Sequence, residues 1–115
     1  MRYLYLSLAF FLASTALQAQ GGSLAKVTGL VTDAVSDAPV DLATVYIDGT
    51  SKAVETSITG RYSITIPVNE EVVLVFSRIG YQEVRAAISP MPSGTSRQVD
   101  VAMPPPHSAL EVIGR

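Results

Sequence analysis

Residues 61–76, which read RYSITIPVNEEVVLVF, decide the fold class of this chain. In the first half, single polar residues separate the apolar side chains of Tyr62, Ile64 and Ile66. This period of two is typical of a strand with one buried face. The second half ends in the unbroken apolar run 72–76. Such a run predicts a central strand that is covered on both faces.

The same alternation continues outward from this stretch in both directions. Four further runs show it, with apolar positions at Val27, Gly29 and Val31, at Ala43, Val45 and Ile47, at Val84, Ala86 and Ile88, and at Val99, Val101 and Met103. Turn residues separate the runs at intervals of about ten residues, so six or seven short strands and an all-β sandwich are predicted. We expect the turn at Gly80 to require a positive φ. Gly94 lies in a polar loop, where we expect an added Cβ to be nearly neutral.

Composition fits one domain and excludes several classes of function. The 115 residues are enough for one domain and too few for two. Eight Lys and Arg residues stand against ten Asp and Glu residues, which gives a formal net charge of −2. No run of like charge offers a surface for nucleic acid or anionic lipid. The chain has no cysteine, which excludes disulfides, thiolate nucleophiles and cysteine zinc clusters.

The N-terminal segment departs from the strand pattern. Residues 1–19 combine one basic residue, Arg2, with an apolar stretch and small residues that end in Ala19. This is the pattern of a signal peptide cleaved after Ala19, so we expect export out of the cytoplasm. The apolar stretch is short for a membrane-spanning helix, and we expect no membrane span after cleavage. A buried N-terminal helix or a short anchor is the alternative.

The C-terminal segment departs from the pattern as well. Three consecutive prolines at residues 104–106 cannot donate hydrogen bonds to a sheet and favour an extended segment. We therefore place the sandwich at residues 25–103 and a Pro-rich tail at residues 104–115.

Few side chains have the arrangement that catalysis or metal binding needs. The single histidine, His107, follows the prolines, and a flexible tail cannot orient its imidazole. Asp33, Asp37 and Asp41 recur at four-residue spacing. They are either oxygen ligands for calcium or ordinary turn formers. We expect Tyr81 to fill the edge of the sandwich with its hydroxyl on backbone. The sequence predicts no catalytic residue, cofactor or metal site.

Segments along the chain, taken in order, resemble the carboxypeptidase-regulatory-like domain. They read VTGLVTD from residue 27, ATVYIDGT from residue 43, TGRYSI from residue 59 and LVFSRIGY from residue 74. The resemblance implies a non-enzymatic, seven-stranded Greek-key sandwich of the transthyretin-like type. Two glycines of the family pattern are absent, because Ser36-Asp37-Ala38 stands in the first turn and Asp41-Leu42-Ala43 precedes the second strand. These departures affect loop shape rather than fold.

The tail is also similar to a known arrangement. In TonB-dependent outer-membrane receptors of the Bacteroidetes type, including the SusC-like ones, this domain follows the signal peptide and precedes a TonB box, a plug and a barrel. A segment here looks like that box, shortened by a residue or so, and consists of Leu110, Glu111, Val112, Ile113 and Gly114. We call residues 110–114 the box segment.

The resemblance implies a non-enzymatic periplasmic module, the N-terminal extension of a TonB-dependent outer-membrane nutrient receptor. Its expected partners are the periplasmic domain of TonB or the plug and barrel of the receptor. A plug and barrel would need many more residues than the chain has after the box segment, so we expect a truncated receptor. The alternative is a free-standing periplasmic or cell-surface module that binds protein or glycan.

Overall fold

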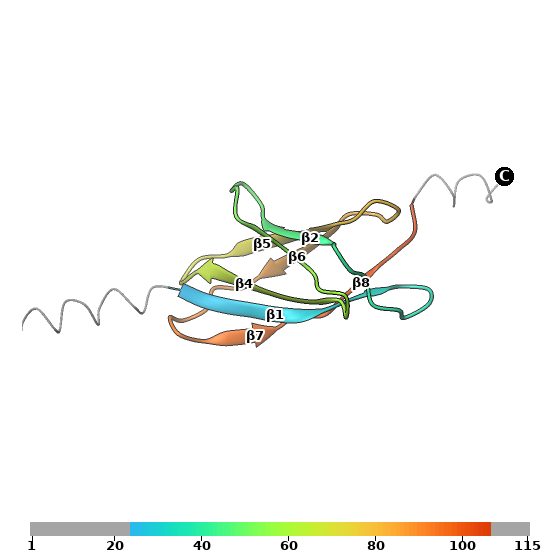
Figure 1. The fold of residues 1–115 in the computed structure, drawn as a ribbon. Coiled ribbons are helices and arrows are strands. Elements are labelled where there is room, and N and C mark those ends of the chain that lie inside the picture. Colours follow the sequence, from blue (N-terminus) through green and yellow to red (C-terminus); the bar gives the residue numbers. More distant parts are fainter. Residues whose placement is uncertain (1–23, 107–115) are drawn as a thin grey trace, which may run out of the picture.

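The computed structural model describes residues 24–106, which form two β-sheets packed face to face (Figure 1). The all-β prediction is confirmed, because residues 24–106 form strands joined by turns and loops, without a helix. No membrane-spanning helix therefore lies within this range. The predicted signal peptide, residues 1–19, and the box segment lie outside the described residues.

The first sheet is built around one long strand. It contains β1 (Leu24–Asp33), β4 (Arg61–Pro67), β7 (Ser96–Gln98) and β8 (Val101–Met103). Strand β1 lies in the middle, with β4 antiparallel on one side and both β7 and β8 parallel on the other. The chain therefore leaves β8 at the end of the sandwich opposite to the start of β1 (Figure 1).

The second sheet has the order β3-β2-β5-β6. Its strands are β2 (Thr44–Ile47), β3 (Ala53–Glu55), β5 (Val72–Ser77) and β6 (Val84–Ile88). The prediction of a central strand is confirmed, because β5 pairs antiparallel with β2 on one side and with β6 on the other. Val75 is fully buried on the opposite side of the strand from Leu74 and Phe76, so both faces of β5 are covered.

The core lies between the two sheets, where the alternating residues meet. Phe76 of β5 is completely buried, and its ring meets the ring of Tyr62 from β4 edge to face. The ring centroids are 5.3 Å apart and the planes meet at 77°. Aromatic pairs favour this geometry, because a ring edge is electropositive and a ring face electronegative. The pair joins the two sheets, since each ring comes from a different one.

Residues 24–106 form eight strands, where six or seven were predicted. The last predicted strand is broken in two, and β3 lies in none of the six predicted runs. Between β7 and β8, the N–H of Val99 donates to the carbonyl of Thr28 at 2.7 Å. The carboxylate of Asp100 accepts from the N–H of Leu30 at 2.9 Å. A side chain thus replaces a ladder carbonyl at the break, while the register of β1 is the same against β7 and against β8. The transthyretin-like Greek-key type stays a prediction.

The break depends on a close approach of two backbones. An ideal Cβ built on Gly29 of β1 would lie 1.9 Å from the carbonyl oxygen of Val99. The hydroxyl of Tyr62 donates to the same oxygen at 2.6 Å. Only glycine leaves room for both the approaching carbonyl and the tyrosine.

Two glycine predictions have different outcomes. Gly80 has a φ of 93°, so the expected positive φ is confirmed. Gly94 has a φ of 76°, and the expectation that a Cβ is neutral there is wrong. No atom lies within 4 Å of a Cβ at Gly94, so the strain comes from the backbone conformation and not from a clash.

Candidate functional site

The chain leaves the sandwich through a segment that is fixed at its start. The N–H of Ala34 donates to the carbonyl of Met103 at 2.9 Å. Gln82 donates twice, from its N–H to the carbonyl of Pro104 at 2.9 Å and from Nε2 to the carbonyl of Pro105 at 2.8 Å. Contacts of the sandwich thus continue past β8 into the prolines. These prolines cannot donate hydrogen bonds, and Gln82 uses their carbonyl groups as acceptors.

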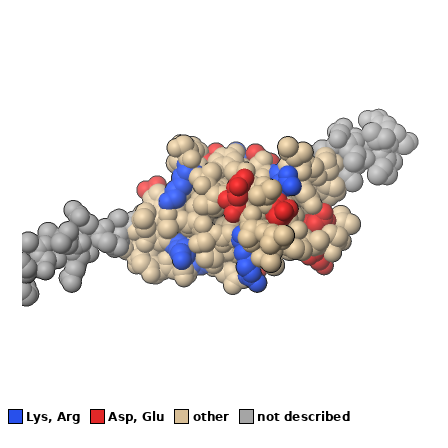
Figure 2. Space-filling model, viewed as in Figure 1, with Lys and Arg blue, Asp and Glu red and all other residues tan. Residues whose placement is uncertain are grey.

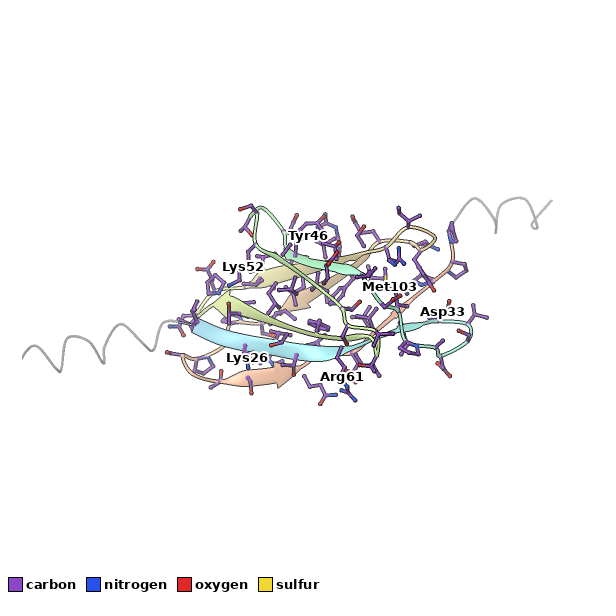
Figure 3. The ribbon with its side chains drawn as sticks, viewed as in Figure 1. Lys26, Asp33, Tyr46, Lys52, Arg61 and Met103 are labelled. Atoms are coloured by element: carbon purple, nitrogen blue, oxygen red, sulfur yellow. The ribbon has the colours of Figure 1, made fainter. Side chains whose placement is uncertain are left out.

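We call this end of the molecule the exit end, defined by residues 34–43, 56–60, 78–83 and 103–106. The three loops follow β1, β3 and β5, which all end on this side. Asp33 and Met103 are register partners here and lie near each other in Figure 3. The exit end therefore collects loops from both sheets around the departing chain.

Asp33 fixes the first of these loops. Its Oδ1 accepts from the N–H of Val35 at 2.8 Å and from the N–H of Ser36 at 3.0 Å, and its Oδ2 accepts from the hydroxyl of Tyr81 at 2.8 Å. Hydrogen bonds from Ser36, Tyr81 and Val35 hold the pKa of Asp33 below its usual value. The pKa of Tyr81 is raised, because its hydroxyl donates to this carboxylate.

The structure favours the turn-forming interpretation of the aspartates over calcium ligation. Both oxygens of Asp33 are used by protein donors. Within residues 24–106, no group of three or more acidic or histidine side chains is close enough to hold a metal ion. The prediction for Tyr81 is right about its position at the edge and wrong about its partner, which is a carboxylate and not backbone. The partner lies 48 residues away in sequence, so no local pattern could reveal it.

Further contacts tie the loops of the exit end to one another. The buried hydroxyl of Thr56 donates to the carbonyl of Val40 at 2.7 Å and accepts from the N–H of Ala43 at 2.9 Å. Arg78 donates from Nε to the carbonyl of Asp41 at 2.9 Å. Each loop is thus held by side chains of another loop, and the surface they form is preorganised.

Aliphatic side chains stand exposed on these fixed loops. Ile79 is 92% exposed, Ile58 82%, Val35 79% and Leu42 55%. The remaining large apolar side chain that is exposed in residues 24–106 is Leu24, at the opposite end. The sequence patterns above did not predict that these four side chains are exposed. An aliphatic residue next to turn residues, as in Arg78-Ile79-Gly80, could have indicated an exposed apolar side chain.

Two shallow hollows lie away from the exit end. One, of about 220 Å³, is lined by Ile47, Asp48, Thr50, Pro67, Glu70, Glu71, Val72 and Val73. The other, of about 300 Å³, is lined by Leu24, Ala25, Lys26, Thr65, Gly94, Thr95 and Ser96. Pockets for small ligands have volumes of roughly 300–1,000 Å³ and enclose most of the ligand.

Acidic and basic side chains are interspersed on the face shown in Figure 2. The exit end therefore differs from the rest of residues 24–106 in its four exposed large apolar side chains.

This fold and its loops define a β-sandwich module. The family model of the CarboxypepD_reg-like domain matches residues 27–113, so the chain belongs to this family, as the sequence motifs predicted. The family consists of non-catalytic β-sandwich domains. Its match continues past β8 through most of the box segment.

Solved structures support the same fold. A protein of unknown function from Bacteroides fragilis NCTC 9343, described as membrane-associated, is 22% identical over 76% of this chain and 30% of its own length, with a TM-score of 0.56. The catechol 1,2-dioxygenase of Acinetobacter sp. ADP1 is 9% identical over 73% of this chain and 53% of its own, with a TM-score of 0.59. The enzyme of Pseudomonas arvilla C-1 is 12% identical over 75% and 53%, also at 0.59.

These likenesses show the fold alone, because the identities are low. The present chain spans about half or less of the length of these three proteins. No curated protein matches the chain.

The residues at the positions of the two missing family glycines, Asp37 and Leu42, have positive φ angles. Asp37 has a φ of 63° and Leu42 a φ of 57°, so both positions keep the left-handed backbone that glycine favours. Aspartate tolerates this conformation better than most residues, whereas leucine rarely adopts it. Both residues thus adopt a backbone conformation that glycine would adopt without strain, and Leu42 is strained there.

Proposed function

We propose that this chain is a non-enzymatic periplasmic module of the transthyretin-like Greek-key type, the N-terminal extension of a TonB-dependent outer-membrane nutrient receptor. The signal peptide, residues 1–19, directs its export. The box segment then contacts the periplasmic domain of TonB, and the sandwich lies against the plug or barrel that follows in the receptor. The observation that carries the proposal is the fixed exit of the chain, which leads into the box segment from the end opposite to the start of β1.

An exit opposite the entry suits a module inserted in line. The ten residues of β1 cover roughly 33 Å at about 3.3 Å per residue, so the sandwich holds the preceding and following segments about that far apart. Because Gln82 fixes Pro104 and Pro105, the chain leaves the sandwich at a defined point.

The polar side chains of the exit end support a binding role and not catalysis. Asp33, Thr56 and Arg78 are engaged in hydrogen bonds that hold loops. None of them is aligned with a nucleophile or a base in the way that acid-base catalysis requires. Membership of a non-catalytic family supports the same view.

The partner of the box segment can be tested directly by NMR. We would titrate the processed chain, residues 20–115, with the periplasmic domain of TonB. An extended segment pairs with a partner sheet through its backbone donors, and Val112 and Ile113 are β-branched. We therefore expect the amide signals of residues 110–114 to shift, while those of β1 and β5 stay in place.

Two variants of one residue sharpen the test. Val112→Pro removes a backbone N–H and should abolish the titration, whereas Val112→Thr keeps the branched shape and the N–H and should titrate normally. The proposal is wrong if the box segment does not shift, or if Val112→Pro titrates like the unchanged chain.

The alternative is a free-standing periplasmic or cell-surface module that binds protein or glycan. It is favoured by Leu42, which is half exposed although its backbone is strained. Strained residues that persist are often part of a binding surface. The reading frame after codon 115 discriminates the two functions. A plug and barrel encoded there support the receptor, and a stop codon in a locus without a receptor supports the free-standing module.

A further inference from the structure

Two largely solvent-exposed aliphatic side chains lie on either side of the point where the chain leaves the sandwich. Val35 is 79% exposed and Ile79 is 92% exposed. Val35 follows Ala34, which is hydrogen-bonded to Met103, and Ile79 lies three residues before Gln82, which is hydrogen-bonded to Pro104 and Pro105. The chain therefore leaves the sandwich between the loops that carry these two side chains.

The two loops are fixed relative to each other. The hydrogen bond of 2.8 Å between the Tyr81 hydroxyl and the Asp33 carboxylate joins them two residues away from Ile79 and from Val35. Val35 is also fixed by its own N–H, which donates to Asp33. The two aliphatic side chains are thus presented by a rigid frame. Exposed apolar groups that are held in place commonly mark a contact surface.

We propose that residues 110–113 of this chain fold back and cover Val35 and Ile79. The four residue steps from Pro106 to Leu110 span at most about 14 Å, and the seven steps to Ile113 span at most about 25 Å, so the box segment is long enough to reach the flanking loops. Val35 and Ile79 are exposed to solvent, and the apolar side chains of the box segment would cover them. These side chains are Leu110, Val112 and Ile113. The family model matches residues 27–113, so residues 110–113 belong to the same matched sequence as the sandwich.

The proposed contact changes how the box segment meets a partner. If the proposed function holds, on which this step rests, TonB must displace the box segment from Val35 and Ile79 before it can pair with it. The apparent affinity is then lowered by the fraction of molecules in which the segment is covered. The sandwich would thereby regulate access to its own box segment.

A spin label tests the contact within one molecule. The chain has no cysteine, so Gly114→Cys provides a single attachment point in residues 20–115. We expect the label to broaden the methyl signals of Val35 and Ile79. Ile58, which is 82% exposed in the loop after β3, serves as the matched control and should be broadened less, because no hydrogen bond joins residues 56–60 to residues 103–106.

Variants separate docking from mere proximity. With the label in place, the combined change Leu110→Ser, Val112→Ser and Ile113→Ser should remove the broadening at Val35 and Ile79. Ile79→Ser, which changes the loop and leaves the tail intact, should reduce the broadening at Val35. Unchanged signals from β1 and β5 would show that these variants are folded.

Three outcomes would overturn the proposal. Equal broadening with and without the serine substitutions would mean that the tail is only nearby, and no broadening at Val35 and Ile79 would mean that it lies elsewhere. Broadening in a mixture of labelled chain and unlabelled, isotope-enriched chain would mean that a second copy covers the loops. The TonB titration is independent of these results, so the docking can fail while the proposed function stands, and the reverse.

Discussion

Replacing Gly29 with alanine is expected to disrupt the parallel side of the first sheet. A Cβ at this position would lie 1.9 Å from the carbonyl oxygen and 2.7 Å from the carbonyl carbon of Val99, and 2.8 Å from the ring of Tyr62. Real Cβ atoms essentially never come within 3.0 Å of such atoms, so the backbone at Val99 must retreat by about 1 Å or more. A flexible side chain could rotate away, but the backbone carbonyl of Val99, held between β7 and β8, cannot.

The expected loss of stability follows from the hydrogen bonds at this point. The retreat breaks or lengthens the bond from the Val99 N–H to Thr28 and the bond from the Tyr62 hydroxyl to Val99. It also strains the bond from the Leu30 N–H to Asp100. At about 0.5–1.5 kcal/mol each, these three bonds are worth roughly 2–4 kcal/mol. Alanine restricts the unfolded chain and returns about 0.4–1 kcal/mol, so the net loss is about 2–3 kcal/mol.

Thermal unfolding measured by circular dichroism checks this value. In a domain of this size about 1 kcal/mol corresponds to roughly 4–8 °C, so Gly29→Ala should lower Tm by about 10–20 °C. Gly94→Ala is the matched control, because it has a positive φ and no atom within 4 Å. Its backbone strain of about 1–2 kcal/mol is offset by about 0.4–1 kcal/mol in the unfolded chain, which leaves roughly 1 kcal/mol and a fall in Tm of about 4–8 °C. Equal Tm values for the two variants would refute the close approach of Gly29 and Val99.

Three further changes test other parts of the structure. Phe76→Ala removes a completely buried ring and its edge-to-face contact with Tyr62, and should lower the free energy of unfolding by about 3–5 kcal/mol in urea titrations. An unchanged urea midpoint would mean that Phe76 is not in the core. The pKa of Asp33 is lowered in the folded state, so its stabilising effect is present above the unfolded pKa and disappears as pH falls through the folded pKa. Asp33→Asn should therefore flatten the acid limb of a plot of Tm against pH, and a limb as steep as that of the unchanged chain would contradict this role. Burial, and to a lesser degree the charge of Asp100, raise the pKa of Tyr62 to about 12. Its contribution is complete below the unfolded pKa of about 10 and is lost as pH rises towards 12, so Tyr62→Phe should weaken alkaline destabilisation, with tyrosine absorbance as the readout.

Most contacts of the exit end could not be predicted from sequence patterns. The motif Ile79-Gly80-Tyr81 predicted a turn with a positive φ, and the structure has it. The pattern did not show that Tyr81 bonds to Asp33, because the hydroxyl acts across two loops. The contact of Gln82 with the prolines was likewise unforeseen, since a glutamine in a loop has no positional signal.

The sequence by itself determined most of the strands, their buried faces and the family. A period of two, as around Ile64, and an unbroken apolar run, as around Leu74 and Phe76, are local properties of an extended chain, so these core residues are recognisable without any knowledge of their neighbours. The motifs that indicate the CarboxypepD_reg-like family are also continuous in sequence.

Only the tertiary structure decided how the strands meet one another. The sequence placed Gly29 on a strand face but not against Val99, which lies 70 residues later and approaches only when β7 and β8 join β1. The break between those two strands escaped prediction for the same reason, because residues 98–103 alternate without interruption. Alternation records which face of a strand is buried, whereas close approach depends on how separate strands are positioned by the whole packed core.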